Sequence, residues 1–167
     1  MTGTVYLVGA GPSDGGLFTL KGLELLQKAD VVVYDALIGL EVMALIPEKT
    51  RKINVGKRSG NHTVPQEEIN QILLREAQAG NEVVRLKGGD PFLFGRGGEE
   101  LELLAEHDVP FQVVPGVTSA LAAPAYGGIP VTHRDYCSSI HIITGHTNRS
   151  PGPNYKALAE MDGTLIF

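Results

Sequence analysis

Short apolar runs alternate with longer helical patterns along most of the chain. The apolar runs are rich in β-branched residues and predict strands at 4–8, 31–34, 52–55, 82–86 and 111–114. Hydrophobic residues at helical spacing predict helices at 17–28, 40–46, 65–79 and 98–107. This alternation predicts a parallel α/β sheet, and the loops that follow its strands should carry the ligands.

The pattern changes at Pro115-Gly116, where we expect a domain boundary. Residues 118–125 are small and Ala-rich, and a strand at 140–144 and a short helix at 155–161 follow. The final apolar residues look like a strand start without a closing turn. We therefore expect an N-terminal α/β domain at 1–114 and the beginning of an incomplete second α/β domain at 115–167, in a truncated chain.

Composition narrows the class of protein. The chain has 167 residues, a net charge of -5 and scattered basic residues, which argues against a nucleic-acid partner. No apolar run approaches the roughly 18 residues of a membrane span, and we find no signal segment. The lone Cys137 cannot form an internal disulfide and favours a reducing compartment. A cytoplasmic protein without a membrane partner is the expectation.

The first predicted strand runs into a glycine loop, Gly9-Ala-Gly-Pro12-Ser-Asp14. It resembles the start of the dinucleotide fingerprint, and Asp35 ends the second strand where a ribose-binding acid would lie. A nicotinamide-binding oxidoreductase is therefore one hypothesis. Against it, Asp14 replaces the third glycine, and Pro12 removes a backbone N–H that a pyrophosphate needs. The alternative is the tight strand-to-helix turn of any parallel α/β domain.

A second glycine loop follows the strand at 82–86. Gly88 and Gly89 permit positive φ and close approach of backbone to a ligand. Asp90 can accept hydrogen bonds from an amine or ribose, and residues 92–94 (Phe-Leu-Phe) can form an apolar wall. The loop lacks the Gly-Lys-Ser/Thr ending of a phosphate loop. A turn followed by two core aromatics is the alternative, and the residues alone leave both interpretations open.

Seven motifs occur together and in order. They are Gly9-Ala-Gly-Pro, Val-Val-Val-Tyr-Asp35, Val-Gly-Lys57-Arg58, Leu-Lys-Gly-Gly-Asp90-Pro-Phe, Phe-Gly-Arg-Gly-Gly-Glu-Glu100, Pro115-Gly-Val-Thr-Ser-Ala120 and Gly-Ile-Pro-Val-Thr-His-Arg-Asp135-Tyr. From Thr4 to Phe167 the chain resembles the uroporphyrinogen-III C-methyltransferase family, within the tetrapyrrole methylases. It departs from that family's pattern at Ser13, where Gly is usual, and at Ser119, where Ala is common.

The resemblance implies a fold and an activity. It implies two α/β domains with a ligand cleft between them, and a homodimer. It also implies S-adenosylmethionine as methyl donor, S-adenosylhomocysteine as product and no metal. The implied reaction methylates uroporphyrinogen III at carbons 2 and 7, giving precorrin-2 for sirohaem and cobalamin. A related precorrin, diphthine or ribosomal-RNA methylase is the nearest alternative.

The resemblance also assigns site residues by motif. The implied cofactor contacts are Pro12, Gly88, Gly89, Asp90, Leu93, Thr118 and Ser119. Asp35 corresponds to a proton acceptor and Lys57 to a proton donor. For Asp35 the alternative is a helix N-cap, and for Lys57 a solvated loop cation.

The implied substrate carries many carboxylates, so a net-acidic protein must concentrate cations near it. Cationic residues in predicted loops are Arg58, His62, Arg96, His133, Arg134 and Arg149. Arg58 and Arg134 lie inside matched motifs and are the expected carboxylate clamps. For the rest, ordinary surface charge is the alternative.

Overall fold

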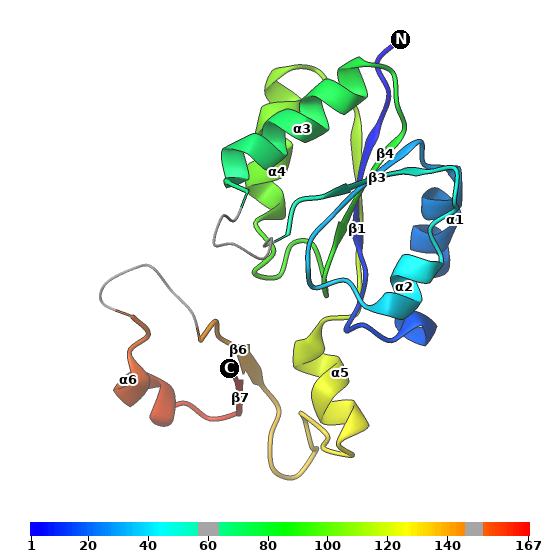
Figure 1. Cartoon of the computed structure of the whole chain (residues 1–167). Helices are drawn as coiled ribbons and strands as arrows, with labels where there is room; N and C mark the ends of the chain where they lie inside the picture. The colour runs from blue at the N-terminus through cyan, green and yellow to red at the C-terminus, as the bar shows by residue number, and fades with distance from the viewer. Residues whose placement is uncertain (57–63, 146–151) are drawn as a thin grey trace. The chain divides into compact units, whose positions relative to one another are not determined.

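The computed structural model describes residues 1–56, 64–145 and 152–167 (Figure 1). The described chain divides into two compact units, Met1–Thr118 and Ser119–Phe167, and each is described by itself. The domain boundary expected between residues 114 and 115 stays a prediction.

The first unit is built on a five-stranded sheet with the order β3-β2-β4-β1-β5, in which every pair is parallel. Its strands are β1 (Val5–Gly9), β2 (Val31–Tyr34), β3 (Arg51–Asn54), β4 (Val83–Lys87) and β5 (Phe111–Val114). Its helices are η1 (Gly15–Leu17), α1 (Leu20–Lys28), α2 (Leu40–Ala44), α3 (Gln66–Gln78) and α4 (Gly97–Glu106). The predicted parallel α/β sheet is thus confirmed.

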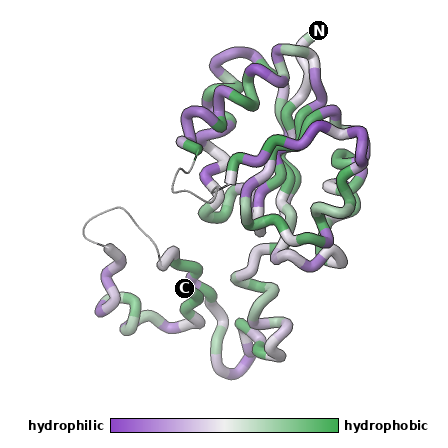
Figure 2. Tube along the Cα trace, viewed as in Figure 1, coloured by the Kyte–Doolittle hydropathy of each residue, from purple (hydrophilic) through white to green (hydrophobic). Residues whose placement is uncertain are grey.

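Helices cover both faces of this sheet (Figure 1). One hydrophobic core joins the strands to α3 and α4, and includes Leu7, Val33 and Leu73. The opposite core joins the strands to α1 and α2, and includes Val32 and Leu26. Because successive strand side chains point to opposite faces, each apolar strand feeds both cores. Hydrophobic residues are accordingly frequent along the sheet in Figure 2.

The sheet has a topological switch point between neighbouring strands β1 and β4. The chain leaves β1 for α1 on one face, and leaves β4 for α4 on the other face. The two glycine loops therefore diverge at the carboxyl edge of the sheet, which is where open α/β sheets bind ligands.

Most predicted strands and helices have ends that differ from the structure by one to three residues, and two of these differences have a clear physical cause. The helix predicted at 17–28 begins at Leu20, because Thr19 caps it by accepting a hydrogen bond from the Gly22 N–H at 3.0 Å. The strand predicted at 82–86 spans Val83–Lys87 in the structure. Its last residue, Lys87, is charged but only 5% exposed, because an ion pair in the interior compensates its burial.

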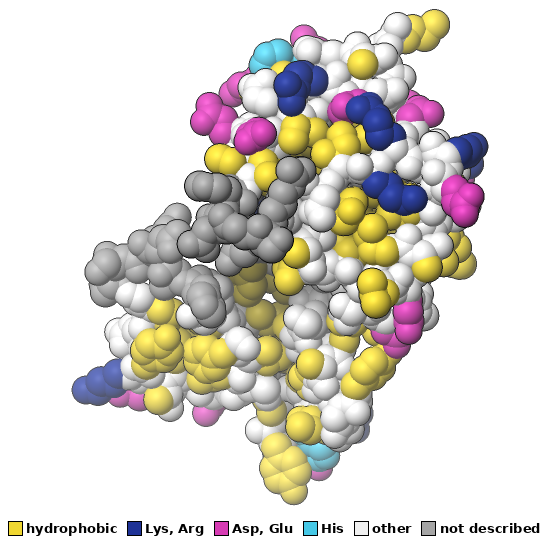
Figure 3. All heavy atoms as spheres, viewed as in Figure 1, with side chains coloured by type: hydrophobic (Ala, Val, Ile, Leu, Met, Phe, Trp, Pro, Cys, Tyr) yellow, Lys and Arg dark blue, Asp and Glu magenta, His cyan; other side chains and the backbone are white. Residues whose placement is uncertain are grey.

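The second unit contains α5 (Ser119–Tyr126), β6 (Ile140–Ile142), α6 (Tyr155–Ala159) and β7 (Thr164–Ile166). Strands β6 and β7 pair in parallel. Among the described residues, no helix is long and apolar enough to cross a membrane. On the face shown in Figure 3, Lys and Arg side chains of the first unit are interspersed with Asp and Glu.

Candidate functional site

The loops that follow β1 and β4 are joined through their backbones. The Gly11 N–H donates to the Gly89 carbonyl at 3.1 Å, and the Gly89 N–H donates to the Gly11 carbonyl at 2.9 Å. The Ala10 N–H donates to the Lys87 carbonyl at 2.7 Å. These bonds extend the sheet past its strands and place the two glycine motifs side by side.

A third loop, after β5, packs directly against this pair. A Cβ at Gly9 would lie 2.5 Å from the Gly116 nitrogen, and a Cβ at Gly116 would overlap the Gly89 carbonyl oxygen. Only glycine lets three backbones approach so closely. Gly89 differs, since its φ is 63° and the nearest atom to a Cβ there is the Thr118 Cα at 4.0 Å. The arrangement leaves bare backbone beside open space at Gly89.

The Asp90 carboxylate ties two of these loops together. Its Oδ1 accepts hydrogen bonds from the Phe92 and Leu93 N–H groups at 2.9 and 3.2 Å, and its Oδ2 accepts one from the Gly116 N–H at 3.1 Å. A carboxylate offers about four acceptor positions. Asp90 therefore organises the loop and retains acceptor capacity for a ligand.

The aromatic residues of this loop are exposed. Phe92 is 57% and Phe94 58% exposed, and Leu93 is half-buried. The alternative of a turn with two core aromatics is therefore wrong for the aromatics, although the turn itself is present. The segment provides apolar surface instead, as the wall hypothesis requires.

The loop after β1 is a tight strand-to-helix turn. Asp14 accepts a hydrogen bond from the Gly16 N–H at 2.7 Å and thereby caps η1, while Pro12 is half-buried. Ser13 has a φ of 83°, a conformation that glycine adopts without strain. Serine at this position therefore carries backbone strain that glycine would not.

Asp35 follows β2 at the same edge of the sheet. Its Oδ1 accepts a hydrogen bond from the Leu37 N–H at 3.0 Å, and its Oδ2 lies 3.6 Å from Arg85 Nη2. The helix N-cap alternative is wrong, because the N-cap of α2 is Gly39. The Asp35 side chain is 24% exposed, so a ligand can reach the carboxylate.

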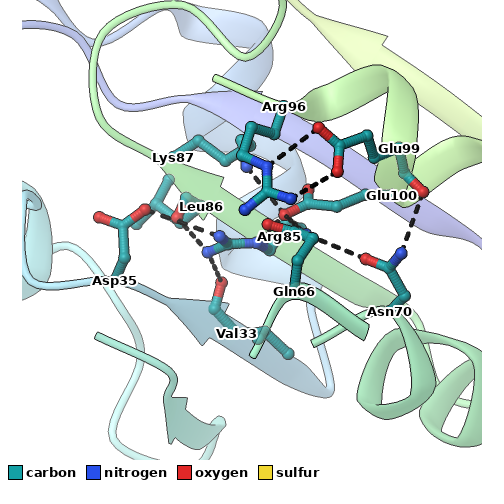
Figure 4. A network of polar contacts seen from close by, with 10 residues as sticks. All are labelled: Val33, Asp35, Gln66, Asn70, Arg85, Leu86, Lys87, Arg96, Glu99 and Glu100. Atoms are coloured by element: carbon teal, nitrogen blue, oxygen red, sulfur yellow. Dashed lines mark hydrogen bonds and ion pairs between the residues drawn. The ribbon is translucent and has the colours of Figure 1, made fainter. Parts of the chain in front are cut away.

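Behind Asp35 lies a buried charge network that the sequence analysis missed (Figure 4). Arg85 and Lys87 are 3% and 5% exposed, and Glu100 is fully buried. Glu100 Oε1 accepts hydrogen bonds from Arg85 Nε at 3.2 Å, Lys87 Nζ at 2.8 Å and Gln66 Nε2 at 3.1 Å. Burial lowers the pKa of the Lys87 ammonium, and Arg85 lowers it further, while Glu100 opposes both effects.

A sequence signal for this network exists. Val83, Arg85 and Lys87 alternate onto one face of β4, and Val83 belongs to the core beneath α3 and α4. Glu100 lies four residues before the buried Leu104 on the inward side of α4. Cations on the strand and an acid on the helix therefore face the same interior.

The remaining predicted site residues fall into three groups. Thr118 is half-buried at the end of the first unit. In the second unit, Ser119 begins α5, and Arg134 is exposed in the turn closed by the His133–Cys137 backbone bonds. Outside the described residues lie Lys57, Arg58, His62 and Arg149.

Two further candidate cations have partners of their own. Arg96 donates to Glu99 through Nε at 2.9 Å and through Nη2 at 2.6 Å. The His133 ring lies 4.7 Å from the Tyr136 ring, centroid to centroid. The structure thus brings together Pro12, Asp35 and the residues of the loop from 88 to 93 at one edge of one sheet.

Known proteins are similar to this chain in sequence and in fold. Siroheme synthase 2 of Serratia proteamaculans is 58% identical over 165 residues, which are 99% of this chain and 35% of that protein. A crystal structure of uroporphyrin III C-methyl transferase from Thermus thermophilus, complexed with S-adenyl homocysteine, is 48% identical with a TM-score of 0.79. The match covers 95% of this chain and 66% of that one.

A cobalt precorrin-4 methyltransferase structure is 34% identical with a TM-score of 0.77, and the match covers 91% of this chain and 61% of that one. The chain spans about a third of the length of the curated relative, at 35%. The family model for tetrapyrrole (corrin/porphyrin) methylases matches residues 4–167. The chain belongs to the tetrapyrrole methylase family.

Proposed function

We propose that the protein carrying this chain transfers methyl groups from S-adenosylmethionine to carbons 2 and 7 of uroporphyrinogen III, giving precorrin-2. The observation that carries the proposal is the bare-backbone platform of Gly9, Gly89 and Gly116 at the switch point of the sheet. Support comes from the 48% identical Thermus thermophilus protein, whose structure is described with S-adenyl homocysteine.

The platform suits a sulfonium nucleoside. A sulfonium carries its positive charge on sulfur and the adjoining carbons, and carbonyl oxygens and apolar groups suit it. The loop offers the Gly89 carbonyl and, a few residues on, the exposed Phe92 and Phe94. The Gly89 carbonyl accepts one hydrogen bond from Gly11 and keeps a second lone pair. Asp90 keeps acceptor capacity for an amine or ribose hydroxyl. The residues assigned to the cofactor are Pro12, Gly88, Gly89, Asp90, Leu93, Thr118 and Ser119.

The bound cofactor supplies an electrophilic methyl group on sulfur. The chemistry requires a new carbon–carbon bond as the sulfur–methyl bond breaks, after which S-adenosylhomocysteine leaves and the macrocycle loses a proton. The protein's main contribution is to hold donor and acceptor in line. In this proposal Asp35 takes the proton, because its carboxylate is reachable and fixed from both oxygens.

The other roles rest on the motifs. Lys57 is assigned as proton donor, and Arg58 and Arg134 are assigned to the substrate carboxylates. A ligand cleft between the two α/β domains, the boundary at 114/115 and a homodimer complete the proposal. Light scattering of the full-length gene product tests the homodimer, and a measured mass equal to that of one monomer would refute it.

Isothermal titration calorimetry with S-adenosylhomocysteine tests the cofactor assignment. The full-length gene product should show saturable binding, and the Gly89→Val variant should not, because a branched side chain at a φ of 63° blocks the open space. Absence of binding heat from the unmodified protein at millimolar ligand would refute the assignment.

The second candidate is methylation of a later corrin precursor. The 34% identity to cobalt precorrin-4 methyltransferase favours it specifically. Cofactor binding is common to both candidates, so the acceptor discriminates. Methylation of uroporphyrinogen III supports the first, whereas turnover only with a methylated corrinoid supports the second.

A further inference from the structure

The buried charge network has an asymmetric centre. Glu100 is fully buried on α4, and its Oε1 accepts from three donors on two other elements, β4 and α3. Among the described residues its Oε2 has no hydrogen-bond partner. A buried carboxylate is costly unless it is well paired, and here one oxygen carries all the hydrogen bonds found among the described residues. Because the three donors share that oxygen, Glu100 fixes their positions relative to one another.

Arg85 is the donor that reaches the candidate site. Its Nε is held by Glu100 at 3.2 Å, its Nη1 donates to the Leu86 carbonyl at 3.1 Å, and its Nη2 lies 3.6 Å from Asp35 Oδ2. The guanidinium is planar and rigid, so fixing one edge determines where the opposite edge points. Figure 4 shows Arg85 lying between Asp35 and Glu100.

Lys87 balances the charges in this interior. Two cations, Arg85 and Lys87, face two carboxylates, Glu100 and Asp35, and only Asp35 is partly exposed. Glu100 is the acceptor shared by both cations. Its removal would leave Lys87 without its partner and would free the Nε edge of Arg85, whose Nη1 would remain bound to the Leu86 and Val33 carbonyls.

We propose that Glu100 is a positioning residue for the Asp35 carboxylate and acts through the guanidinium of Arg85. This inference rests on the proposed function, in which Asp35 accepts the proton. Asp35 is held from one side by the Leu37 N–H and from the other by Arg85. Without the Glu100 bond to Nε, the guanidinium can turn about its bonded Nη1, which moves Nη2 away from Asp35 and frees one carboxylate oxygen to rotate.

The test compares Glu100→Met with Glu99→Met in the full-length gene product. Glu99 is the adjacent residue on α4. Its half-exposed side chain pairs with Arg96, and its backbone carbonyl, which accepts from Asn70, is kept in the variant. Titration with S-adenosylhomocysteine gives the fraction of binding-competent protein, and kcat is then expressed per competent molecule. For Glu100→Met we expect kcat to fall about 10- to 100-fold, with ligand affinity unchanged within about twofold. Glu99→Met should retain the kcat of the unmodified protein.

A purely structural role for Glu100 has a different signature. It lowers the binding-competent fraction and leaves kcat per competent molecule unchanged, and that result would overturn the proposal. If Glu100→Met does not fold, Glu100→Met/Lys87→Met replaces both members of a buried pair and leaves no lone ammonium. The double variant should fold and show the same loss of kcat; full kcat in it would also overturn the proposal.

A crystal structure of Glu100→Met separates this inference from the proposed function. We expect the guanidinium of Arg85 to have left the Asp35 carboxylate. Arg85 still at its position beside Asp35 would overturn the inference, whatever the activity. Failure of the unmodified protein to methylate uroporphyrinogen III would instead refute the proposed function, while the structural comparison still decides whether Glu100 positions Arg85.

Discussion

Asp90→Asn should loosen the connection between the loops after β4 and β5. The Asp90 carboxylate accepts from Phe92 and Leu93 on one oxygen and from Gly116 on the other. An asparagine has one acceptor oxygen, so keeping the first two bonds turns its NH₂ toward the Gly116 N–H. The Gly116 amide then loses its partner and faces another donor.

The magnitude follows from the bond that is lost. A hydrogen bond to a charged group contributes about 1.5–3 kcal/mol, and the partial exposure of Asp90 places it near the lower end. A loss of about 1.4 kcal/mol corresponds to a tenfold change in an equilibrium constant. Hydrogen exchange of the Gly116 amide should therefore accelerate about tenfold, and S-adenosylhomocysteine should bind about tenfold more weakly.

Amide hydrogen exchange resolved at Gly116 is the assay. Asp30→Asn is the matched control, because the Asp30 carboxylate accepts a backbone hydrogen bond in the described part of the chain, from the Glu82 N–H at 2.9 Å, which an asparagine oxygen can retain. The control should leave Gly116 exchange unchanged. Exchange at Gly116 that stays within twofold of the unmodified protein in Asp90→Asn would refute the reasoning.

Three further predictions concern stability and packing. Burial and the bond to Glu82 raise the pKa of Tyr6 above its ordinary 10.0. The bond therefore stabilises the fold fully below pH 10 and less as the pH rises through the folded pKa. The stability difference between Tyr6→Phe and the unmodified protein, measured by urea unfolding, should shrink above pH 10, and a pH-independent difference would contradict this. Ser13→Gly should raise the free energy of unfolding by about 0.5–1 kcal/mol by relieving a φ of 83°, and a decrease in urea unfolding would count against the strain. Gly116→Ala should lower the free energy of unfolding by about 1–3 kcal/mol, because a methyl group there overpacks three backbones, and it should abolish S-adenosylhomocysteine binding in calorimetry. Gly98→Ala is the control, since a Cβ at Gly98 meets nothing within 4 Å, and it should have neither effect. Equal behaviour of the two variants would contradict the packing argument.

Much of the fold was predictable because it follows from local patterns. The strands at 31–34 and 111–114 have their predicted bounds, since short runs of apolar residues leave few alternatives. The helix predicted at 17–28 was wrong at its start, because Thr19 competes as a cap and η1 precedes it. Such capping depends on where the Thr19 hydroxyl lies relative to the backbone N–H groups, and the spacing of hydrophobic residues carries no information about that.

The candidate site was predictable only in part. Adjacent glycines after apolar strands indicated close backbone approach, and the structure joins Gly11 to Gly89 as that interpretation requires. The charge network was missed because Arg85 and Glu100 are 15 residues apart and meet only once α4 packs on β4. Burial of a charge is a tertiary property, and its sequence signal is an inward-facing position on two separate elements.

Methyl transfer from labelled S-adenosylmethionine to uroporphyrinogen III tests the central claim most directly. The full-length gene product should form a labelled tetrapyrrole methylated at carbons 2 and 7, together with S-adenosylhomocysteine. Asp35→Asn should lower the rate by about 100-fold or more, the contribution typical of a general base. If Asp35→Asn forms the labelled product at the unmodified rate, the assignment of Asp35 as the base is contradicted. If the unmodified protein binds S-adenosylhomocysteine but forms no labelled product, the account as a whole is contradicted.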